Sequence, residues 1–528
     1  MKSIFAHSLL LSALLSPLAL TSHAATWYYD ADNAASSANF SQTGGDADTD
    51  GLWYTYEGDT KVYIRNALPG EGDDIILGEG TNTDSKILTM DSDAVFASIT
   101  YNSGVRLIGQ GSTKLTIEGN VTQLRQAVLT LSKFDLHIMG DFIGHSNGFA
   151  ADLTGGTSVR IDGDVDGATF MDLSATGESS LDNPNIVISG AVLHKDARIF
   201  LRTVGADSYY SIGGLSGGYA RITRNTSGEG TSHLILTNAS DYTYGEGSAI
   251  ADYNTGGRYT SEANFPVWNE VGKLKLYMRG TAKQIIQGNA RFSGGVQVIS
   301  GELRIRFNQG AEQYTYYTNS EKTKLVTFWT QANEGTQTTF THGDLEMVGG
   351  KFGNEEGAAC ASFRFTNIVY SGGTIAINIS SEENVNDSID LTSYYKRVAE
   401  SGQDDVYTKV DGGTISLAEG VAEGTKVTFE FSGDVLGWLL DYEDGSFEIN
   451  DGKGAKIVSW DAENKTALLA SDFAGNIITQ GDDYMPVFTV DDDGLYVRYT
   501  VVPEPAEVAA ILGALALAAV ALRRRNRN

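Results

Sequence analysis

The chain of 528 residues contains a single cysteine, Cys360, so no disulfide within the chain can stabilise it. Basic residues are also scarce: 38 Lys and Arg stand against 67 Asp and Glu, for a formal net charge of −29. Binding to a phosphate backbone requires basic residues to neutralise it, so this balance excludes nucleic acid as a partner. We expect Cys360 to be a small buried residue rather than a nucleophile, since no histidine lies near it in the sequence.

Proline is rare too, with seven residues, whereas glycine is abundant, with 61. A hydrophobic content of 41% and 25 tyrosines are too high for a disordered chain. The composition therefore predicts a folded, turn-rich protein that favours β-structure. Length alone suggests several domains, but that expectation fails for repeat proteins, so internal repeats have to be sought first.

Residues 1–24 have the features of a secretory signal peptide. A basic residue, Lys2, precedes an apolar run that extends to Leu20, and small residues occupy positions 22 and 24. We expect cleavage before Ala25 and export of the chain from the cytoplasm.

The last segment, residues 501–528, contains an uninterrupted apolar stretch from Val508 to Leu522. As a helix, these residues span about 22 Å, which is less than the ~30 Å hydrocarbon core of a bilayer. The stretch therefore predicts a short transmembrane helix that anchors the chain only transiently in the inner membrane. The arginine cluster that follows should stay in the cytoplasm. It consists of Arg523, Arg524 and Arg525.

Pro503, Glu504 and Pro505 stand shortly before this apolar stretch. Pro-Glu-Pro, a hydrophobic helix and an arginine cluster, in this order, resemble the PEP-CTERM sorting signal, over residues 503–528 only. The resemblance implies that an exosortase and the secretion machinery of a Gram-negative envelope act on the chain and remove its tail during export. An ordinary C-terminal membrane anchor is the alternative.

A seven-residue unit recurs in the body of the chain: apolar, any residue, Ile, any residue, Gly, any residue, apolar. It occurs at Leu115–Val121, Leu136–Phe142, Val159–Val165 and Ile186–Val192, with a looser copy at Tyr210–Gly214. Alternation places the Ile and its apolar neighbours on one face of a strand, and the Gly marks a tight bend. Because so short a strand cannot bury its face alone, the copies are expected to stack on one another.

Glycine pairs precede further alternating strands, at 155–156, 294–295, 372–373 and 412–413. Repeats of this length, with two or three short strands and no sustained helical period, are typical of a parallel β-helix. The predicted fold is therefore all-β, a right-handed parallel β-helix (β-solenoid). An antiparallel β-sandwich whose strands happen to look alike is the alternative.

The segment Thr281–Leu303 resembles the autotransporter-associated β-strand repeat, and Pro69–Leu77 resembles the opening coil of bacterial surface β-helices. This resemblance implies a passenger-like surface β-helix, which we place at residues 25–345. Residues 346–500 are expected to be further solenoid or a β cap. We predict that they end in an edge strand, Gly494–Val501, and that the neighbouring aspartates 491–493 prevent end-to-end pairing.

A calcium-binding loop is predicted at residues 46–57, because oxygen ligands alternate along it before a closing carboxylate. The candidate ligands are Asp46, Asp48, Asp50, Leu52 and Glu57. The flanking residues do not have a helical pattern, so any site would be a free-standing loop. A chance match in a chain rich in Asp and Gly is the alternative.

Proteins with a parallel β-helix include polysaccharide lyases and glycoside hydrolases. Hydrolysis needs two carboxylates at a defined separation, one protonated and one ionised. Pieces of a polygalacturonase-like set occur at 73–74, 82–84 and 144–146, but their order is wrong and other elements are absent, so we interpret them as coincidence. The N-terminal aromatic residues are expected to cap the first coil rather than to stack on sugars. These are Trp27, Tyr28, Trp53 and Tyr54.

The sequence thus predicts an exported, non-enzymatic β-solenoid that is an exosortase substrate. Its role would be structural or adhesive, at the cell surface or in the extracellular polysaccharide matrix, with polysaccharide as a partner. No catalytic residue and no cofactor other than calcium is expected. A carbohydrate-active β-helix enzyme is the alternative function.

Overall fold

The structure is a computed structural model. It describes residues 24–30, 37–42, 51–78, 86–102, 104–125, 128–145, 149–193, 198–202, 207–217, 221–225, 230–244, 249–251, 273–287, 289–290, 292–306, 314–317, 325–328, 337–341, 343–356, 358, 360–379, 386–398, 406–433, 452–478, 484–501 and 517. The elements formed by these residues are β-strands, apart from two short 3-10 helices, η4 (Ala462–Asn464) and η5 (Ala470–Asp472). The chain is therefore nearly all-β, as predicted.

The largest sheet, sheet A, runs along the whole body and is parallel except at its N-terminal end. Its strands are β1 (Thr26–Tyr29), β3 (Trp53–Glu57), β4 (Thr60–Ile64), β5 (Asp74–Leu77), β7 (Ala94–Phe96), β8 (Ser98–Tyr101), β10 (Lys114–Ile117), β11 (Val121–Gln123), β13 (Asp135–Ile138), β14 (Phe142–Ile143), β16 (Val159–Ile161), β17 (Val165–Asp166), β19 (Ile186–Leu193), β21 (Ser208–Ser216), β23 (Thr231–Leu236), β26 (Lys273–Met278), β29 (Gly295–Val298), β34 (Leu345–Met347), β37 (Ile368–Tyr370) and β42 (Ile415–Leu417).

Two further sheets are parallel throughout. Sheet B consists of β2 (Ser37–Asn39), β6 (Ile87–Met90), β9 (Arg106–Gly109), β12 (Val128–Ser132), β15 (Phe149–Gly156), β18 (Ala168–Ala175), β20 (Arg198–Arg202), β22 (Arg221–Asn225), β25 (Ala249–Ala251) and β28 (Asn289–Ala290). Sheet C consists of β24 (Tyr242–Tyr244), β27 (Lys283–Gln287), β30 (Glu302–Arg306), β35 (Lys351–Asn354), β38 (Thr374–Ile379), β43 (Val427–Gly433) and β45 (Phe473–Ile477).

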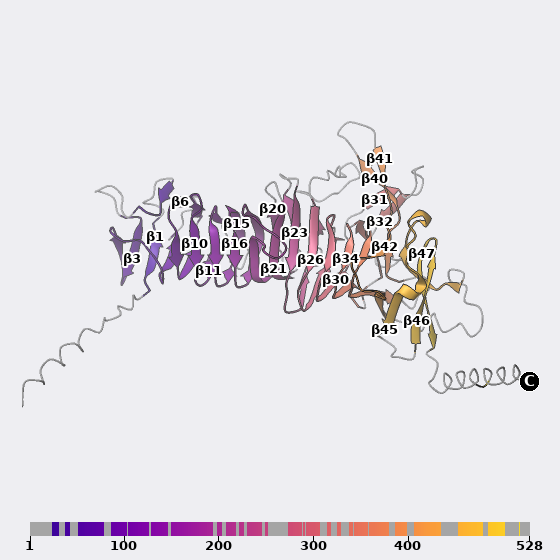
Figure 1. Cartoon of the computed structure of the whole chain (residues 1–528). Coiled ribbons are helices and arrows are strands. Elements are labelled where there is room, and N and C mark those ends of the chain that lie inside the picture. Colours follow the sequence, from indigo (N-terminus) through magenta and orange to yellow (C-terminus); the bar gives the residue numbers. More distant parts are fainter. Residues whose placement is uncertain are drawn as a thin grey trace, which may run out of the picture.

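Two smaller sheets complete the structure. Sheet D is antiparallel and consists of β31 (Tyr314–Tyr317), β32 (Leu325–Phe328), β40 (Tyr394–Val398) and β41 (Val406–Val410). Sheet E consists of β33 (Gln337–Thr341), β36 (Ala361–Arg364), β39 (Ser388–Asp390), β44 (Ala455–Ser459), β46 (Tyr484–Asp491) and β47 (Gly494–Val501). Figure 1 shows the strands of the parallel sheets stacked along one elongated body.

The seven-residue repeat forms the central ladder of sheet A. Its isoleucines pair in register from one copy to the next and are completely buried. They are Ile117, Ile138, Ile161, Ile188 and Ile212. The predicted stacking of these segments is confirmed. This parallel pairing excludes the antiparallel sandwich, because neighbouring strands of such a sandwich would run in opposite directions.

The chain visits the sheets in a recurring order, and we call each such pass a rung. Between β9 and β18 a strand of sheet B is followed by two strands of sheet A, and between β24 and β30 the order is C, B, A. From β33 to β39 a strand of sheet E takes the place of the strand of sheet B. The ladder also crosses the boundary expected after residue 345, which falls inside β34.

The glycine of each of the first four repeat copies is required by the close approach of the preceding rung. A Cβ atom on Gly140 would lie 2.3 Å from Asn120 Oδ1, closer than real contacts allow. The residue after each glycine joins the rungs: the Asp141 amide donates to Asn120 Oδ1 at 2.8 Å, and the Asp164 amide donates to Asp141 Oδ1 at 2.9 Å. Hydrogen bonds from backbone amides to side-chain oxygens thus join the bends of successive rungs into a second ladder.

Antiparallel hairpins occupy the two ends of the body, β3–β4 at one end and β46–β47 at the other (Figure 1). The strand predicted at Gly494–Val501 is confirmed, but its predicted position at an edge is wrong. β47 pairs with β44 on one side and with β46 on the other, so β46 is the edge strand. The aspartates 491–493 lie at the hairpin turn and form ion pairs with Lys453, Lys456 and Lys465.

The predicted signal peptide and sorting segment lie outside the described residues, apart from Ala24, Val501 and Leu517. Among the residues that the structure describes, no helix has the length and apolar character needed to cross a membrane. Cys360 is buried, as expected.

Candidate functional site

A polar cluster lies on the outward side of sheet A, where β21, β23, β26, β29 and β34 follow one another. Along these strands completely buried core residues, such as Leu234 and Leu276, alternate with polar ones. The polar residues occupy two register rows, Tyr209, His233 and Lys275 in one and Tyr277, Gln297 and Glu346 in the other. We call these six residues, together with Asp207, the sheet A cluster.

His233 is the centre of the sheet A cluster. Its Nδ1 lies 2.9 Å from Tyr277 Oη, and its Nε2 lies 3.4 Å from Asp207 Oδ2, a polar contact without hydrogen-bond geometry. The Tyr209 ring stacks on the imidazole, with ring centroids 4.1 Å apart. An ionised carboxylate only accepts, so the proton of a neutral His233 belongs on Nε2, and Tyr277 then donates to Nδ1.

Burial sets the protonation states of this cluster. Desolvation lowers the pKa of His233, and nearby Lys275 lowers it further, while Asp207 opposes both effects. Desolvation also raises the pKa of Tyr277 and the pKa of Tyr209 above the ordinary value for a phenol. At neutral pH His233 is therefore uncharged and both tyrosines keep their protons.

Lys275 and Glu346 connect strands that are two rungs apart. Lys275 Nζ lies 2.6 Å from Glu346 Oε1, and Gln297, on the strand between them, donates to Glu346 Oε2 at 2.5 Å. Both Glu346 oxygens are thus engaged by donors from neighbouring rungs.

The sheet A cluster does not have the arrangement that glycoside hydrolysis requires. A general acid would need an accessible carboxyl group that stays protonated, together with a second, free carboxylate. Glu346 accepts from two donors, the His233 ring is covered by Tyr209, and the proton of Tyr277 is directed at His233. Chemically, the cluster is suited to joining neighbouring rungs.

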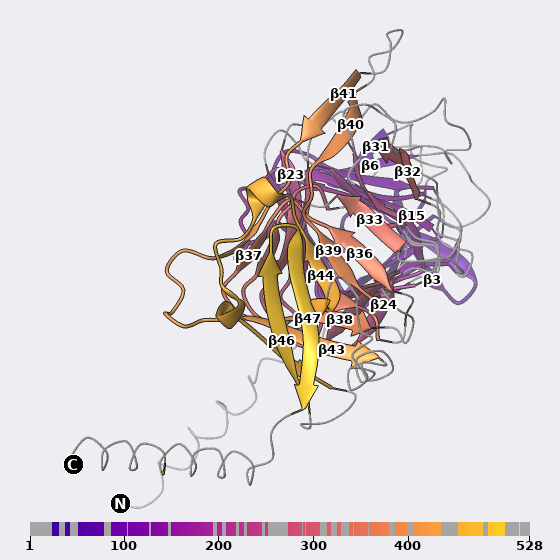
Figure 2. The ribbon, with the colours of Figure 1, turned by 90° about the vertical axis from the view of Figure 1, so that its right-hand side faces the viewer.

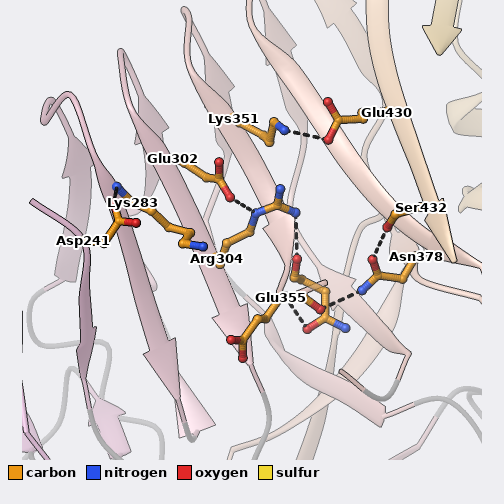
Figure 3. A network of polar contacts seen from close by, with 10 residues as sticks. Asp241, Lys283, Glu302, Arg304, Lys351, Glu355, Asn378, Glu430 and Ser432 are labelled. Carbon is orange, nitrogen blue, oxygen red and sulfur yellow. Dashed lines mark hydrogen bonds and ion pairs between the residues drawn. The ribbon is translucent and has the colours of Figure 1, made fainter. Parts of the chain in front are cut away.

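A second polar network lies on sheet C and at its junction with sheet E (Figure 3). Arg304 is almost fully buried and donates to Glu302 Oε1 at 2.6 Å and to the Asn354 carbonyl at 2.8 Å. Lys351 Nζ lies 2.6 Å from Glu430 Oε1, across the intervening strand β38. Lys351 and Glu430 are thus paired across rungs, as in the sheet A cluster, whereas Arg304 and Glu302 lie on the same strand, β30.

Asp387 is the buried carboxylate of this network. It accepts hydrogen bonds from the Ala361 amide at 2.7 Å, the Asn378 amide at 2.8 Å and Asn354 Nδ2 at 3.0 Å. Desolvation raises its pKa to about 7, although these hydrogen bonds and nearby Arg304 act in the opposite direction. The carboxyl group has no exposed surface, so a substrate cannot reach it.

Two of the five predicted calcium ligands are described, and the structure does not bring them together. The Leu52 carbonyl accepts from the Asp30 amide at 2.9 Å, and Glu57 is exposed at the far end of the extended strand β3. Five residues of strand separate these positions by about 16 Å. Asp46, Asp48 and Asp50 lie outside the described residues, so the calcium loop stays a prediction. Calorimetric titration of the chain and of its Asp48→Ala variant with calcium is the measurement that tests it.

The polygalacturonase-like pieces do not form a described site. Asp73 accepts from the amides of Ala25 and Gly70 at the start of β5, and Asp74 accepts from the Ser98 hydroxyl. These hydrogen bonds hold the turn before β5 and connect β5 to its neighbouring rungs. Residues 82–84 and 146 lie outside the described part of the chain.

The N-terminal aromatic residues are mostly core residues. Trp27, Trp53 and Tyr54 are buried, and Tyr28 stacks on Tyr54 with ring centroids 5.2 Å apart. Their position beside the hairpin β3–β4 agrees with the expected capping of the first coil. The predicted sorting residues all lie outside the described part of the chain. They are Pro503, Glu504, Pro505, Arg523, Arg524 and Arg525.

The sequence reasoning missed the sheet A cluster. In this part of the chain the rungs lose their regular length: Thr231 pairs with Lys273, so this rung is almost twice as long as the earlier ones. The repeat ends with the fifth copy, Tyr210–Gly214, and without a period the outward rows cannot be aligned. The clearest signal available was the alternation of Lys and Leu in β26.

Comparison with known proteins finds no matching family model, no matching curated protein and no matching solved structure.

Proposed function

We propose that the body is a right-handed parallel β-solenoid and that the protein is a non-enzymatic structural or adhesive component of the cell surface or of an extracellular polysaccharide matrix. The observation that carries this proposal is the parallel ladder of sheet A, which continues from β5 to β42. A ladder of this kind makes a stiff rod, because every rung is packed on its neighbours.

Two features support the solenoid. Within each stretch of the chain the sheets recur in a regular order, and successive rungs stack position on position. Parallel strands joined by crossover connections are right-handed in about 98% of cases, which favours the right-handed form.

The paired state of the outward charges supports a structural rather than a catalytic role. Lys275 with Glu346, Lys351 with Glu430, and Arg364 with Asp390 all join different rungs. Groups that act as acid, base or nucleophile need a free position near a substrate. Charged groups that form ion pairs with another rung stabilise the stack instead.

Export and sorting are part of the proposal. The signal peptide at residues 1–24 would direct the chain out of the cytoplasm, and the tail at 503–528 would be recognised and removed by an exosortase. The inner membrane would then hold the chain only transiently. A strongly acidic rod would be released to the surface.

Intact-mass measurement of the protein recovered from its native envelope tests the sorting proposal. We expect a chain that begins at Ala25 and lacks the apolar stretch that starts at Val508. A variant with Pro503→Ala, Glu504→Ala and Pro505→Ala should keep that stretch, because the sorting enzyme would no longer recognise it. Recovery of the unaltered chain with residues 508–528 still attached would instead establish the ordinary membrane anchor.

A carbohydrate-active enzyme is the alternative, and an activity screen separates the two functions. The purified protein is incubated with uronate polymers and mucin-type glycans, and new reducing ends and unsaturated uronates are measured. We expect no product above that of heat-denatured protein. Sustained release of oligosaccharides by the folded protein would reverse the proposal.

A further inference from the structure

The backbone nitrogen of Ala25 lies beside a carboxylate. It donates to Asp73 Oδ1 at 3.0 Å, and the Ala25 carbonyl accepts from the Asp74 amide at 3.0 Å. Ala25 thus extends the pairing of β1 with β5 by one residue. β1 lies at the end of the body opposite the hairpin β46–β47 (Figure 1), which is nearest the viewer in Figure 2. Ala25 is also the residue with which the chain is expected to begin once the signal peptide is removed.

Asp73 is held in place independently of Ala25. Its Oδ2 accepts from the Gly70 amide at 2.9 Å, and its own amide donates to the Gly70 carbonyl at 3.1 Å. Gly72 completes this turn with a φ of 82°, in the region that favours glycine. The Asp73 carbonyl accepts from the Ala97 amide at 2.8 Å, in the next rung. The turn and the neighbouring rung therefore orient the carboxylate toward residue 25.

The described contacts that place Ala25 come from residues that follow it in the chain. Thr26–Tyr29 pair in register with β5, and Trp27 is buried in the core. Ala25 is half-buried and packs against the same core, whereas Ala24 is exposed. Loss of residues 1–24 therefore removes none of these contacts, and the nitrogen of Ala25 stays beside Asp73.

We propose that Asp73 is the binding site for the charged N-terminus of the processed protein. This inference rests on the proposed export, which places the cleavage before Ala25. Hydrolysis of the bond between Ala24 and Ala25 by one water molecule yields the Ala24 carboxylate and the Ala25 ammonium. The nitrogen that donates to Asp73 as a neutral amide in the precursor then carries a positive charge. A hydrogen bond becomes an ion pair at the same position.

The ion pair strengthens a contact that already exists. Replacement of a neutral donor by an ammonium group adds the attraction between two opposite charges. Both groups are partly exposed to water, so we expect the modest gain of a surface ion pair, a factor of about two to five in the closing equilibrium of β1. Removal of the signal peptide would thus fasten β1 to β5, the first parallel strand pair of sheet A.

The ion pair also gives the processed chain a pH dependence that the precursor lacks. An α-amino group has an ordinary pKa of about 7.7–8.0, and a carboxylate beside it raises this pKa. The charged groups on the neighbouring strands are Glu57 on β3, Lys61 on β4, and Asp73 and Asp74 at the start of β5, and Asp73 contacts the nitrogen. Because the folded pKa lies above the unfolded one, the stabilisation is present below about pH 8 and is lost as the pH rises through the folded pKa.

The test measures the pKa of the Ala25 α-amino group. The processed chain, made to begin at Ala25 and to extend to residue 528, is kept in mild detergent. Acetylation of its N-terminus by trace acetic anhydride is followed against pH by mass spectrometry. Asp73→Asn should lower the midpoint by about half a pH unit, a threefold change in proton affinity, because the amide accepts a hydrogen bond without a charge. Asp74→Asn is the matched control, since the Asp74 side chain binds the Ser98 hydroxyl, and it should keep most of the shift.

Hydrogen exchange of the β1 amides gives a second measurement that needs no substitution. The processed chain is compared with a chain that keeps residues 21–24, in which the nitrogen of Ala25 is still an amide. At pH 7 we expect exchange to be about two to five times slower in the processed chain. At pH 9.5 the two chains should exchange at nearly the same rate, because the α-amino group has lost its charge.

The outcomes separate this inference from the proposed function. If Asp73→Asn leaves the midpoint unchanged, if Asp74→Asn lowers it as much, or if the two chains exchange equally at pH 7, the inference is overturned. The proposed export then still depends on the intact mass of the protein from its native envelope. If that mass shows a first residue other than Ala25, the inference is overturned as well, while the product measurements decide the structural role independently.

Discussion

Replacement of Ile161 by aspartate is expected to lower the free energy of unfolding by more than about 4 kcal/mol. Ile161 is completely buried and pairs with Ile138 on one side and Ile188 on the other. An aspartate there would be a charge without a partner inside the core. In a structure where each rung contacts only its neighbours, the damage should also separate the unfolding of the two flanking parts of the ladder.

Denaturant unfolding and limited proteolysis measure this effect. We expect a second unfolding transition and new cleavage near residue 161. Two controls accompany the variant: Ile161→Val, which should cost about 0.5–1.5 kcal/mol, and Arg160→Ala at the neighbouring outward position, which should change stability by less than about 0.5 kcal/mol. An Ile161→Asp protein with a single, unshifted transition would contradict the buried ladder.

Replacement of Asp387 by asparagine is expected to destabilise the protein by about 2–4 kcal/mol, although the two side chains have nearly the same shape. Both carboxylate oxygens accept N–H groups, from Ala361 and Asn354 on one side and from Asn378 on the other. Whichever way the asparagine amide is placed, its NH₂ group faces another donor. One buried donor is then left unpaired.

The pH dependence of stability should change in the same variant. The pKa of Asp387 in the folded protein, about 7, lies above its unfolded value near 4, so the folded state binds this proton more tightly. Its contribution to stability is therefore fully present below about pH 4 and is lost as the pH rises to 7. In the asparagine variant this contribution should disappear.

Urea unfolding at pH 5 and pH 8 tests both expectations. The difference between the two pH values should be smaller in Asp387→Asn than in the unaltered chain. Asp182→Asn is the matched control, because Asp182 is strongly exposed and pairs with Arg279 at the surface. It should stay within about 0.5 kcal/mol of the unaltered protein. An Asp387→Asn protein as stable as this control would show that the network does not require the carboxylate.

Short-range pattern made part of the structure predictable. The spacing of Leu115, Ile117 and Gly119, repeated four times, contains both the alternation of a strand and the bend that ends it. A slip by one residue would expose every buried side chain of a strand, so the pattern also specifies the register in which the copies stack. The burial of Cys360 was predicted as well, because no histidine near it in the sequence could make it a nucleophile.

The candidate sites were less predictable because they depend on contacts between distant residues. His233 meets Tyr277 only after a rung of irregular length, and Lys275 reaches Glu346 across an intervening strand. Sheet D joins hairpins from separate insertions through Tyr317 and Tyr395. Segment length, which does not appear in the local pattern, decides which residues become neighbours in these cases.

Local sequence is sufficient to predict that this protein is β-rich, that its isoleucine repeats stack and that its glycines form the bends, since each of these follows from the properties of adjacent residues. Only the tertiary structure decided that β46 rather than β47 is the edge strand, that the outward charges pair across rungs, and that two distant hairpins form one sheet. These features arise from backbone pairing between segments far apart in the chain, for which local composition carries no information.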